Sequence, residues 1–204
     1  MPRLRRLKED GKGRDGRVVE CGRPRYGWDM EKGSGTVIRL TKLSDTSLIV
    51  HWMSAEAGLL KTVAKGARRA RSAFAGRLDL FVQADIQWIP SRKSELHLLG
   101  EVSVRDFRKG LRERYRDAVV AAYFGQLLEL VLEWDHPEPE MADLLDRGLS
   151  YLENRGADRR ALYYFEREVA RFLGIGRRGH VGILEAYGKL PKSRDHCLEL
   201  LPEK

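Results

Sequence analysis

The sequence predicts an α+β protein in which a small five-stranded β-barrel precedes a small helical domain. Two observations support this prediction. Between residues 35 and 105, short β-branched segments alternate with turn signals, and no helical stretch separates most of them. After Asp106 the spacing of apolar residues changes to the period of an amphipathic helix. We therefore expect a flexible basic extension (1–33), a barrel (34–105) and a helical domain (106–204).

Five segments of the first half have the composition of strands. They are parted by turns at Ser44-Asp45 and Gly58, by a long loop after Ala64, and by Pro90. The segments are GTVIRLTKL, TSLIVHWMS, LLKTVAKG, RLDLFVQADIQWI and ELHLLGEVSV. Short strands of this number in so short a span indicate a closed or nearly closed barrel. An OB-type barrel has this strand count and size, and an SH3-like barrel also fits the pattern.

Three helices are expected in the second half. The first carries an apolar stripe from Leu111 to Val131. Asp135 is the expected N-cap of the second helix, and Asp158 that of the third, which should end at Gly174. Beyond Gly174 the chain is broken by glycines, and only a short helix near 193–201 is expected. None of these stripes can stabilise an isolated helix, so the helices should pack together and against the barrel.

The first 33 residues are rich in Gly and charge and show no sustained periodicity. Met30 stands directly before the first strand signal, so a start at Met30 is an alternative to a genuine basic arm. The stretch lacks the apolar region of a secretory signal, and no apolar run is long enough to span a membrane. Cys21 and Cys197 lie too far apart in sequence to indicate a disulfide framework. We expect a cytoplasmic, nucleoid-associated protein.

The distribution of charge is more informative than its total. The 204-residue chain has a formal net charge of +8. Lys and Arg outnumber Asp and Glu by ten to six in residues 1–34 and by eleven to six in 35–105, but not in 106–204, where there are seventeen against eighteen. Within the barrel the excess concentrates in AKGARRARSAFAGRLDL (64–80), here called the basic loop. Such an excess predicts a polyanionic partner.

No motif for catalysis or metal binding is present. His51 and His97 fall inside strands without a nucleophile partner, and we expect them in the barrel wall. The barrel carboxylates lack the lysine-flanked arrangement of a two-metal nuclease. His180, His196 and Cys197 have the wrong spacing for zinc, and GIGRRG lacks the strand and helix that flank a phosphate loop. We expect no enzymatic activity and no cofactor.

Binding of a nucleic acid is the function that these residues favour. Lys and Arg attract phosphates without sequence preference, and aromatic side chains add platforms for bases. Phe74 either stacks on a base or holds the basic loop against the barrel, and Trp52 and Trp88 are more typical of a core. The candidate nucleic-acid-binding residues are Lys65, Arg68, Arg69, Arg71, Phe74 and Arg77 in the loop, Arg39 and Lys42 in the first strand, Arg92 and Lys93 after the fourth, and Arg108, Lys109 and Arg112 at the joint between the domains.

Several short motifs in the first half resemble those of a known protein family. A Ser-Asp-Thr turn at Ser44–Thr46 is followed by an x-E-x-G turn at Glu56–Gly58, by KGARR, and by F-x-G-x-L-x-x-F from Phe74 to Phe81. Together they resemble the N-terminal domain of the DNA recombination and repair protein RecO family. AAYFGQLLELVL (121–132) and FEREVARFLG (165–174) resemble helices of the same family. The resemblance covers about residues 35–175 and is more specific in the first half.

The resemblance implies an OB-fold barrel joined to a helical domain, without catalytic residues or a bound nucleotide. It also implies binding of single- and double-stranded DNA, annealing of complementary strands, and work with RecR to load the RecA recombinase onto DNA coated by single-strand-binding protein (SSB). Several family members carry a four-cysteine zinc module, but the helical half here has only Cys197, so no zinc is expected. In the family, the C-terminal tail of SSB lies in an apolar groove with basic edges. Candidate edge residues are Arg159, Arg160, Arg177 and Arg178.

Two other functions fit the residues without the resemblance. The first is an OB-fold barrel that binds structured RNA, which would use the same basic loop but would not anneal DNA. The second is a non-catalytic interaction scaffold whose helical half is the functional part. A scaffold of this kind would bind its partner independently of salt and would tolerate mutation of the loop.

Overall fold

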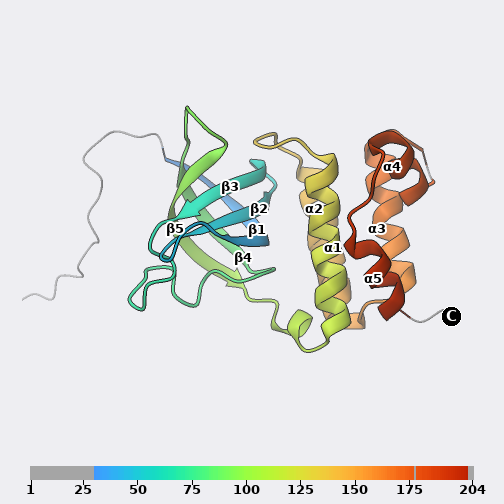
Figure 1. Cartoon of the computed structure of the whole chain (residues 1–204), viewed down its shortest axis with the longest axis horizontal. Helices are drawn as coiled ribbons and strands as arrows, with labels where there is room; N and C mark the ends of the chain where they lie inside the picture. The colour runs from blue at the N-terminus through green and yellow to red at the C-terminus, as the bar shows by residue number, and fades with distance from the viewer. Residues whose placement is uncertain (1–29, 177, 202–204) are drawn as a thin grey trace, which may run out of the picture.

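A β-barrel stands beside a bundle of helices in the computed structural model, which describes residues 30–176 and 178–201 (Figure 1). The strands are β1 (Glu31–Lys42), β2 (Leu48–Ser54), β3 (Gly58–Ala64), β4 (Gln83–Ile89) and β5 (Leu96–Asp106). They close in the order β1-β2-β3-β5-β4, with all pairs antiparallel except β3 with β5. This five-stranded closure is that of an OB fold, so the OB-type prediction is confirmed over the SH3-like alternative.

Two strands begin elsewhere than the sequence pattern predicts. β1 starts at Glu31, four residues before the expected Gly35, because Glu31 to Thr36 pair with β4. β4 starts only at Gln83, because the residues from Arg77 onward form turns, with Val82 N donating to Asp79 O at 3.3 Å. Residues 1–29, which hold Cys21 and most of the expected basic extension, lie outside the described residues.

Alternating side chains of the strands fill the barrel. Val50, Trp52, Leu60 and Trp88 are among the residues that point inward, and all are buried. The indole N–H of Trp52 donates to Thr62 Oγ1 at 2.8 Å, so the buried polar end of the ring is satisfied. Both tryptophans are therefore core residues and do not present their rings to a ligand.

The described residues of the second half form a short 3₁₀ turn and five helices. They are η1 (Lys109–Arg112), α1 (Tyr115–Val131), α2 (Pro139–Arg155), α3 (Arg159–Phe172), α4 (His180–Tyr187) and α5 (Ser193–Leu200). Asp158 caps α3 as predicted, with its Oδ1 accepting from Ala161 N at 2.7 Å, and Gly174 follows the helix with a positive φ. α4 was not predicted, because glycines surround it and its apolar stripe is short. No helix in the described residues is long and apolar enough to cross a membrane.

The prediction that Asp135 caps α2 is wrong. The helix begins at Pro139, with Glu138 at the cap position. Asp135 instead joins the two domains: its backbone N–H donates to Leu59 O at 2.8 Å, and its carboxylate contacts His97 Nε2 at 2.9 Å. The segment between α1 and α2 is therefore an additional connection to the barrel.

A bulge in β1 sets how the barrel meets the helices. The register with β2 shifts between Val37 and Arg39, so Val37 packs inside the barrel and Ile38 packs on the helical side. Gly125 of α1 faces Ile38 so closely that a Cβ there would lie 3.0 Å from the Cβ of Ile38. α1 and α2 thus lie next to the barrel, and α3, α4 and α5 lie beyond them (Figure 1).

A buried carboxylate joins the helices to one another. Glu166 of α3 accepts from the hydroxyl of Tyr123 at 2.6 Å and from Arg194 Nε at 2.6 Å, and lies 3.3 Å from His180 Nδ1. Burial and the charge of Glu166 raise the pKa of Tyr123 far above its ordinary value, so the phenol remains a donor.

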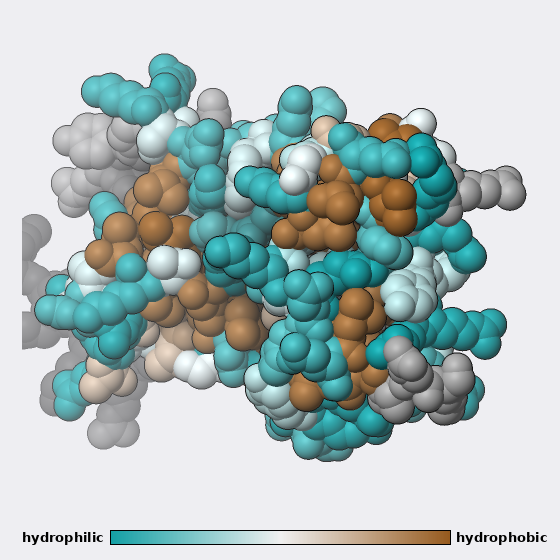
Figure 2. Space-filling model, turned by 45° about the vertical axis from the view of Figure 1, so that its right-hand side comes forward, coloured by the Kyte–Doolittle hydropathy of each residue, from teal (hydrophilic) through white to brown (hydrophobic). Residues whose placement is uncertain are grey.

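On the surface, apolar residues gather in separate patches among hydrophilic ones on the face that Figure 2 shows.

Candidate nucleic-acid interface and helical groove

The basic loop is built from consecutive tight turns. Arg69 N donates to Gly66 O at 3.0 Å, Ser72 N to Arg69 O at 3.1 Å, and Arg77 N to Phe74 O at 3.0 Å. The ring of Phe74 is 9% exposed and packs with the barrel core. The loop therefore has defined internal hydrogen bonds and one apolar anchor, and it presents its cations from a supported backbone.

Two arginines of the basic loop use their guanidinium groups to hold the structure. Arg68 Nη1 lies 3.2 Å from Ser44 O and 3.3 Å from Asp45 O, and its backbone N–H donates to Thr46 O at 3.0 Å. Arg77 Nη1 donates to Val102 O at 3.2 Å. Both side chains stay exposed, so each can still meet a phosphate, but part of its hydrogen-bonding capacity is occupied.

The remaining three cations of the loop are differently placed. Lys65, Arg69 and Arg71 are exposed and make no ion pair or side-chain hydrogen bond with the rest of the described chain. Nothing in this part of the structure offsets their mutual repulsion. Cations held in this way are suited to the phosphates of a nucleic acid.

Of the two roles expected for Phe74, stacking on a base does not fit the structure, because its ring is buried in the barrel core. The alternative role, holding the loop against the barrel, is the one that the structure supports. The same burial applies to Trp52 and Trp88, which are 0% and 2% exposed. The basic loop thus offers charge without an aromatic platform.

The basic segment at the joint between the domains is largely engaged with acidic side chains. Arg108 is 3% exposed, forms an ion pair with Asp146 and donates to Ser150 Oγ, so it is not available to a phosphate and its predicted binding role is wrong. Arg112 pairs with Asp79 at 3.2 Å and donates to Leu80 O at 2.6 Å. Lys109 alone of the three predicted residues is exposed without an ion pair in the described part of the chain.

The other predicted cations lie around the barrel. Arg39 pairs with Glu129 of α1, and Lys42 pairs with Asp45 at 2.7 Å. Arg92 and Lys93 are exposed in the loop between β4 and β5. That loop follows the end of β4 and the basic loop precedes its start, so the two stand at opposite ends of the barrel (Figure 1). The structure does not bring all the predicted residues into one patch.

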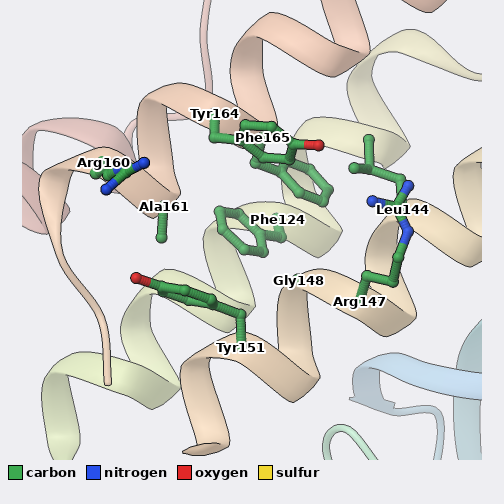
Figure 3. A pocket seen from close by; sticks show the side chains of 9 residues that line it. All are labelled: Phe124, Leu144, Arg147, Gly148, Tyr151, Arg160, Ala161, Tyr164 and Phe165. Atoms are coloured by element: carbon green, nitrogen blue, oxygen red, sulfur yellow. The ribbon is translucent and has the colours of Figure 1, made fainter. Parts of the chain in front are cut away.

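A groove of about 410 Å³ opens between α2 and α3 (Figure 3). Its floor is the stacked pair Phe124 and Phe165, whose ring centroids are 3.9 Å apart. Gly148 leaves room above this floor: a Cβ there would lie 3.2 Å from Phe124. Tyr151 and Tyr164, 41% and 42% exposed, form the walls.

Two arginines stand at the edges of this groove. Arg160 is exposed, and Arg147 forms an ion pair with Asp143 at 2.7 Å. Arg160 was among the edge residues expected from the sequence; Arg147 was missed, because only the packing of α2 against α3 brings it there. Arg159 donates to Leu201 O at 3.1 Å, Arg178 pairs with Glu185 at 2.8 Å, and Arg177 lies outside the described residues. The groove combines an apolar floor with cationic edges.

Among the described residues, the titratable side chains form no candidate metal site. No group of three or more His, Cys, Asp or Glu residues that could hold a metal ion occurs in the described ranges 30–176 and 178–201. His51 and His97, expected in the barrel wall, hydrogen-bond to Glu129 and Asp135 of the helical half. Cys197 is buried, and burial raises the pKa of its thiol to about 12.

Fold and surface together define a class of protein: an OB-fold barrel with a cationic loop, joined to a helical domain with an apolar groove. Comparison with known proteins narrows this class. The family described as "Recombination protein O N terminal" matches residues 30–108, that is, the barrel and its joint. By this N-terminal domain the chain belongs to the RecO family.

Similar proteins are known from several bacteria. The DNA repair protein RecO of Rhodopirellula baltica is 30% identical over 138 residues, which are 68% of this chain and 51% of that protein. That of Thermosynechococcus vestitus is 30% identical over 158 residues (78% and 52%), and that of a Cyanothece species is 28% identical over 171 residues (84% and 54%). The chain spans about half the length of the curated relatives it matches.

Proposed function

We propose that this chain binds single- and double-stranded DNA through its barrel and acts as a mediator of DNA repair and homologous recombination in the cytoplasm, at the nucleoid. In this role it anneals complementary single strands and helps to load recombinase onto SSB-coated DNA. The observation that carries the proposal is the set of unpaired cations, Lys65, Arg69 and Arg71, on a supported loop of an OB fold. The name of the relatives, DNA repair protein RecO, supports DNA as the polyanion.

Annealing requires a surface that reduces the repulsion between two phosphate backbones while leaving base edges free to pair. A loop that contributes charge without an aromatic platform meets both conditions, because it contacts phosphates and does not hold bases. The buried positions of Phe74, Trp52 and Trp88 support this mechanism. It requires no nucleotide, no metal and no catalytic residue.

The groove between α2 and α3 is the proposed site for the C-terminal tail of SSB. That tail is acidic and hydrophobic, and the groove has an apolar floor and the cationic edges Arg147 and Arg160. Changing Arg160 to Glu should weaken binding of a labelled SSB C-terminal peptide by at least about tenfold, since a close charge contact is converted into repulsion. Arg155→Glu on the same helix pair, outside the groove lining, is the matched control. Equal peptide affinity of both variants would remove this groove as the tail site.

RecR is also a proposed partner, without an assigned surface.

Annealing of two complementary labelled oligonucleotides across a salt series tests the proposed function. The account predicts faster annealing with the protein present, and an acceleration that fades as salt rises. Binding of single strands without acceleration would favour the RNA-binding alternative, which a folded RNA competitor would then reveal. Salt-independent partner binding without any nucleic-acid binding would favour the scaffold.

A further inference from the structure

A second cavity, of about 550 Å³, lies where the barrel meets the helical domain. The outer side of the barrel contributes Arg39, His51 and Lys61, and α1 contributes Glu129. The connection between α4 and α5, residues 189–192, closes the other side. Three parts of the chain that are far apart in sequence thus form one cavity, which the proposed annealing surface does not use.

The charge that this cavity presents to a ligand is positive. Its carboxylate, Glu129, is engaged by Arg39 on one oxygen and by His51 Nδ1 at 2.6 Å on the other. Lys189 and Lys192 at the rim are exposed and form no ion pair within the described residues. An anionic ligand would therefore meet two unpaired ammonium groups at the rim rather than an unpaired carboxylate.

The cavity also has an apolar wall. Trp134 is partly exposed there, with Lys61 Nζ 3.8 Å from its ring centroid and the His51 ring edge-on at 5.3 Å. Leu190 and Pro191 line the cavity from the opposite side. In contrast to Trp52 and Trp88, the indole of Trp134 lies within reach of a ligand. The ammonium group of Lys61 is paired with Glu95 at 2.9 Å, so the two rim lysines supply the cations for a phosphate, and Trp134 supplies the ring for its base.

The outer face of the barrel connects this cavity to the basic loop. Arg39, His51 and Lys61 form one cross-strand row, and the next row along the strands is Thr41, Ile49 and Val63. β3 then ends at Ala64, and the basic loop follows with Lys65. At about 3.3 Å per residue, Lys61 and Lys65 are roughly 13 Å apart, a distance that about four stacked nucleotides cover.

We propose that the cavity between the barrel and the α4–α5 connection is a nucleotide subsite, which holds one phosphate and its base of a single strand that the basic loop also binds. The inference rests on the proposed DNA binding and deepens it. The strand runs from Lys65 across the outer face of β1–β3, its phosphate meets Lys189 and Lys192, and its base packs against Trp134. The loop then binds the strand through its phosphates alone. The subsite holds one nucleotide of the strand at a defined position on the protein.

Trp134 provides the readout. Titration of the full chain with an oligothymidine strand of about sixteen nucleotides, the upper site size of one OB fold, should quench tryptophan emission. Trp134→Phe should lose most of this quench and still bind the strand, as measured by anisotropy of a labelled oligonucleotide. Lys189→Ala with Lys192→Ala should also lose the quench, lower the affinity several-fold and reduce the salt slope by about 0.7, since the contact with one phosphate of the single strand is removed. Arg155→Ala with Arg171→Ala, exposed on α2 and α3, is the control of equal charge change.

The outcomes separate this inference from the proposed function. Loop-dependent binding of the strand, with Trp134 emission unchanged and the lysine pair variant equal to the control, would overturn the subsite and leave the DNA-binding proposal standing. Failure of the native protein to bind the strand at low salt would overturn both. A quench that persists in Trp134→Phe would come from another tryptophan and would also contradict the subsite.

Discussion

At the scale of single residues, Glu129 shows how the joint between the domains is stabilised. Its carboxylate accepts from Arg39 of β1 and contacts His51 of β2 at 2.6 Å, and its side chain is 11% exposed. Burial alone would raise the pKa of Glu129, but the hydrogen bonds from His51 and Arg39 and the charge of Arg39 outweigh burial, so the pKa lies below its ordinary value. The carboxylate therefore stabilises the folded state.

Replacing Glu129 by Gln should lower the free energy of unfolding by about 1.5–3 kcal/mol near neutral pH, the range for hydrogen bonds to a charged group. Because the pKa is lower in the folded state than in the unfolded chain, the stabilisation is complete above the unfolded-state value of about 4.3. It is lost as the pH falls through the folded-state pKa. The free energy of unfolding, measured in urea, should therefore fall less steeply with decreasing pH for Glu129→Gln than for the native protein. Parallel declines would show that Glu129 contributes nothing to the pH dependence.

Sequence alone could predict which residues are cationic but not which cations are free. Arg68 and Arg69 are neighbours in the same motif, yet Arg68 is tied to carbonyl oxygens of the β1–β2 turn and Arg69 is not. Arg108 belongs to an equally basic stretch, but it is buried against Asp146, a residue nearly forty positions later. Such pairings depend on contacts between segments distant in sequence, which no local pattern encodes.

At the scale of secondary-structure elements, the β2–β3 turn packs closely against the connection between α1 and α2. Gly58 has φ +69°, and a Cβ there would lie 1.7 Å from His136 O. The backbone of this turn therefore needs glycine for its conformation and also for the close approach of the neighbouring segment. Gly76 in the basic loop has the same φ of +69°, but a Cβ there would meet nothing within 4 Å.

This pair of glycines allows backbone strain to be separated from steric contact. Gly76→Ala should cost about 1–2 kcal/mol of stability, the penalty of a left-handed residue with a Cβ. Gly58→Ala should cost clearly more, because the connection to α2 must also move away from the barrel. Urea unfolding of the two variants measures the difference. Equal losses would mean that the α1–α2 connection yields without cost and does not hold the domains together.

The elements that the sequence predicts best have strong local signals. The alternation in β2 and the stripe of α1 are each read directly from apolar spacing, and Asp158 marks the start of α3 by its capping chemistry. The start of β4 and the existence of α4 were missed, because their boundaries depend on turns and tertiary contacts rather than on periodicity. An apolar groove with basic edges could be expected in the helical half. Which residues line it could not, because that is decided by how α2 packs against α3.

At the scale of the whole molecule, the fold separates cations that are paired with carboxylates from cations that have no such partner among the described residues. Those at the joint are largely paired with carboxylates of the helical half, such as Asp146 and Glu129. Those of the basic loop stand at an end of the barrel and have no such partners among the described residues. A chain with the same composition but a different fold would not keep this separation. The central claim is therefore that Lys65, Arg69 and Arg71 together bind the phosphate backbone.

The most direct test is the affinity for a labelled single strand across a salt series, for the native protein and for the combined Lys65→Ala, Arg69→Ala and Arg71→Ala variant. Arg68 is left intact, because it also anchors the loop. The account predicts weaker binding and a salt slope reduced by about 2, since three phosphate contacts are lost at about 0.7 each on single strands. Circular dichroism should show an unchanged fold, since none of the three side chains makes an ion pair or a hydrogen bond within the described chain. A folded variant with native affinity and native salt slope would contradict the claim.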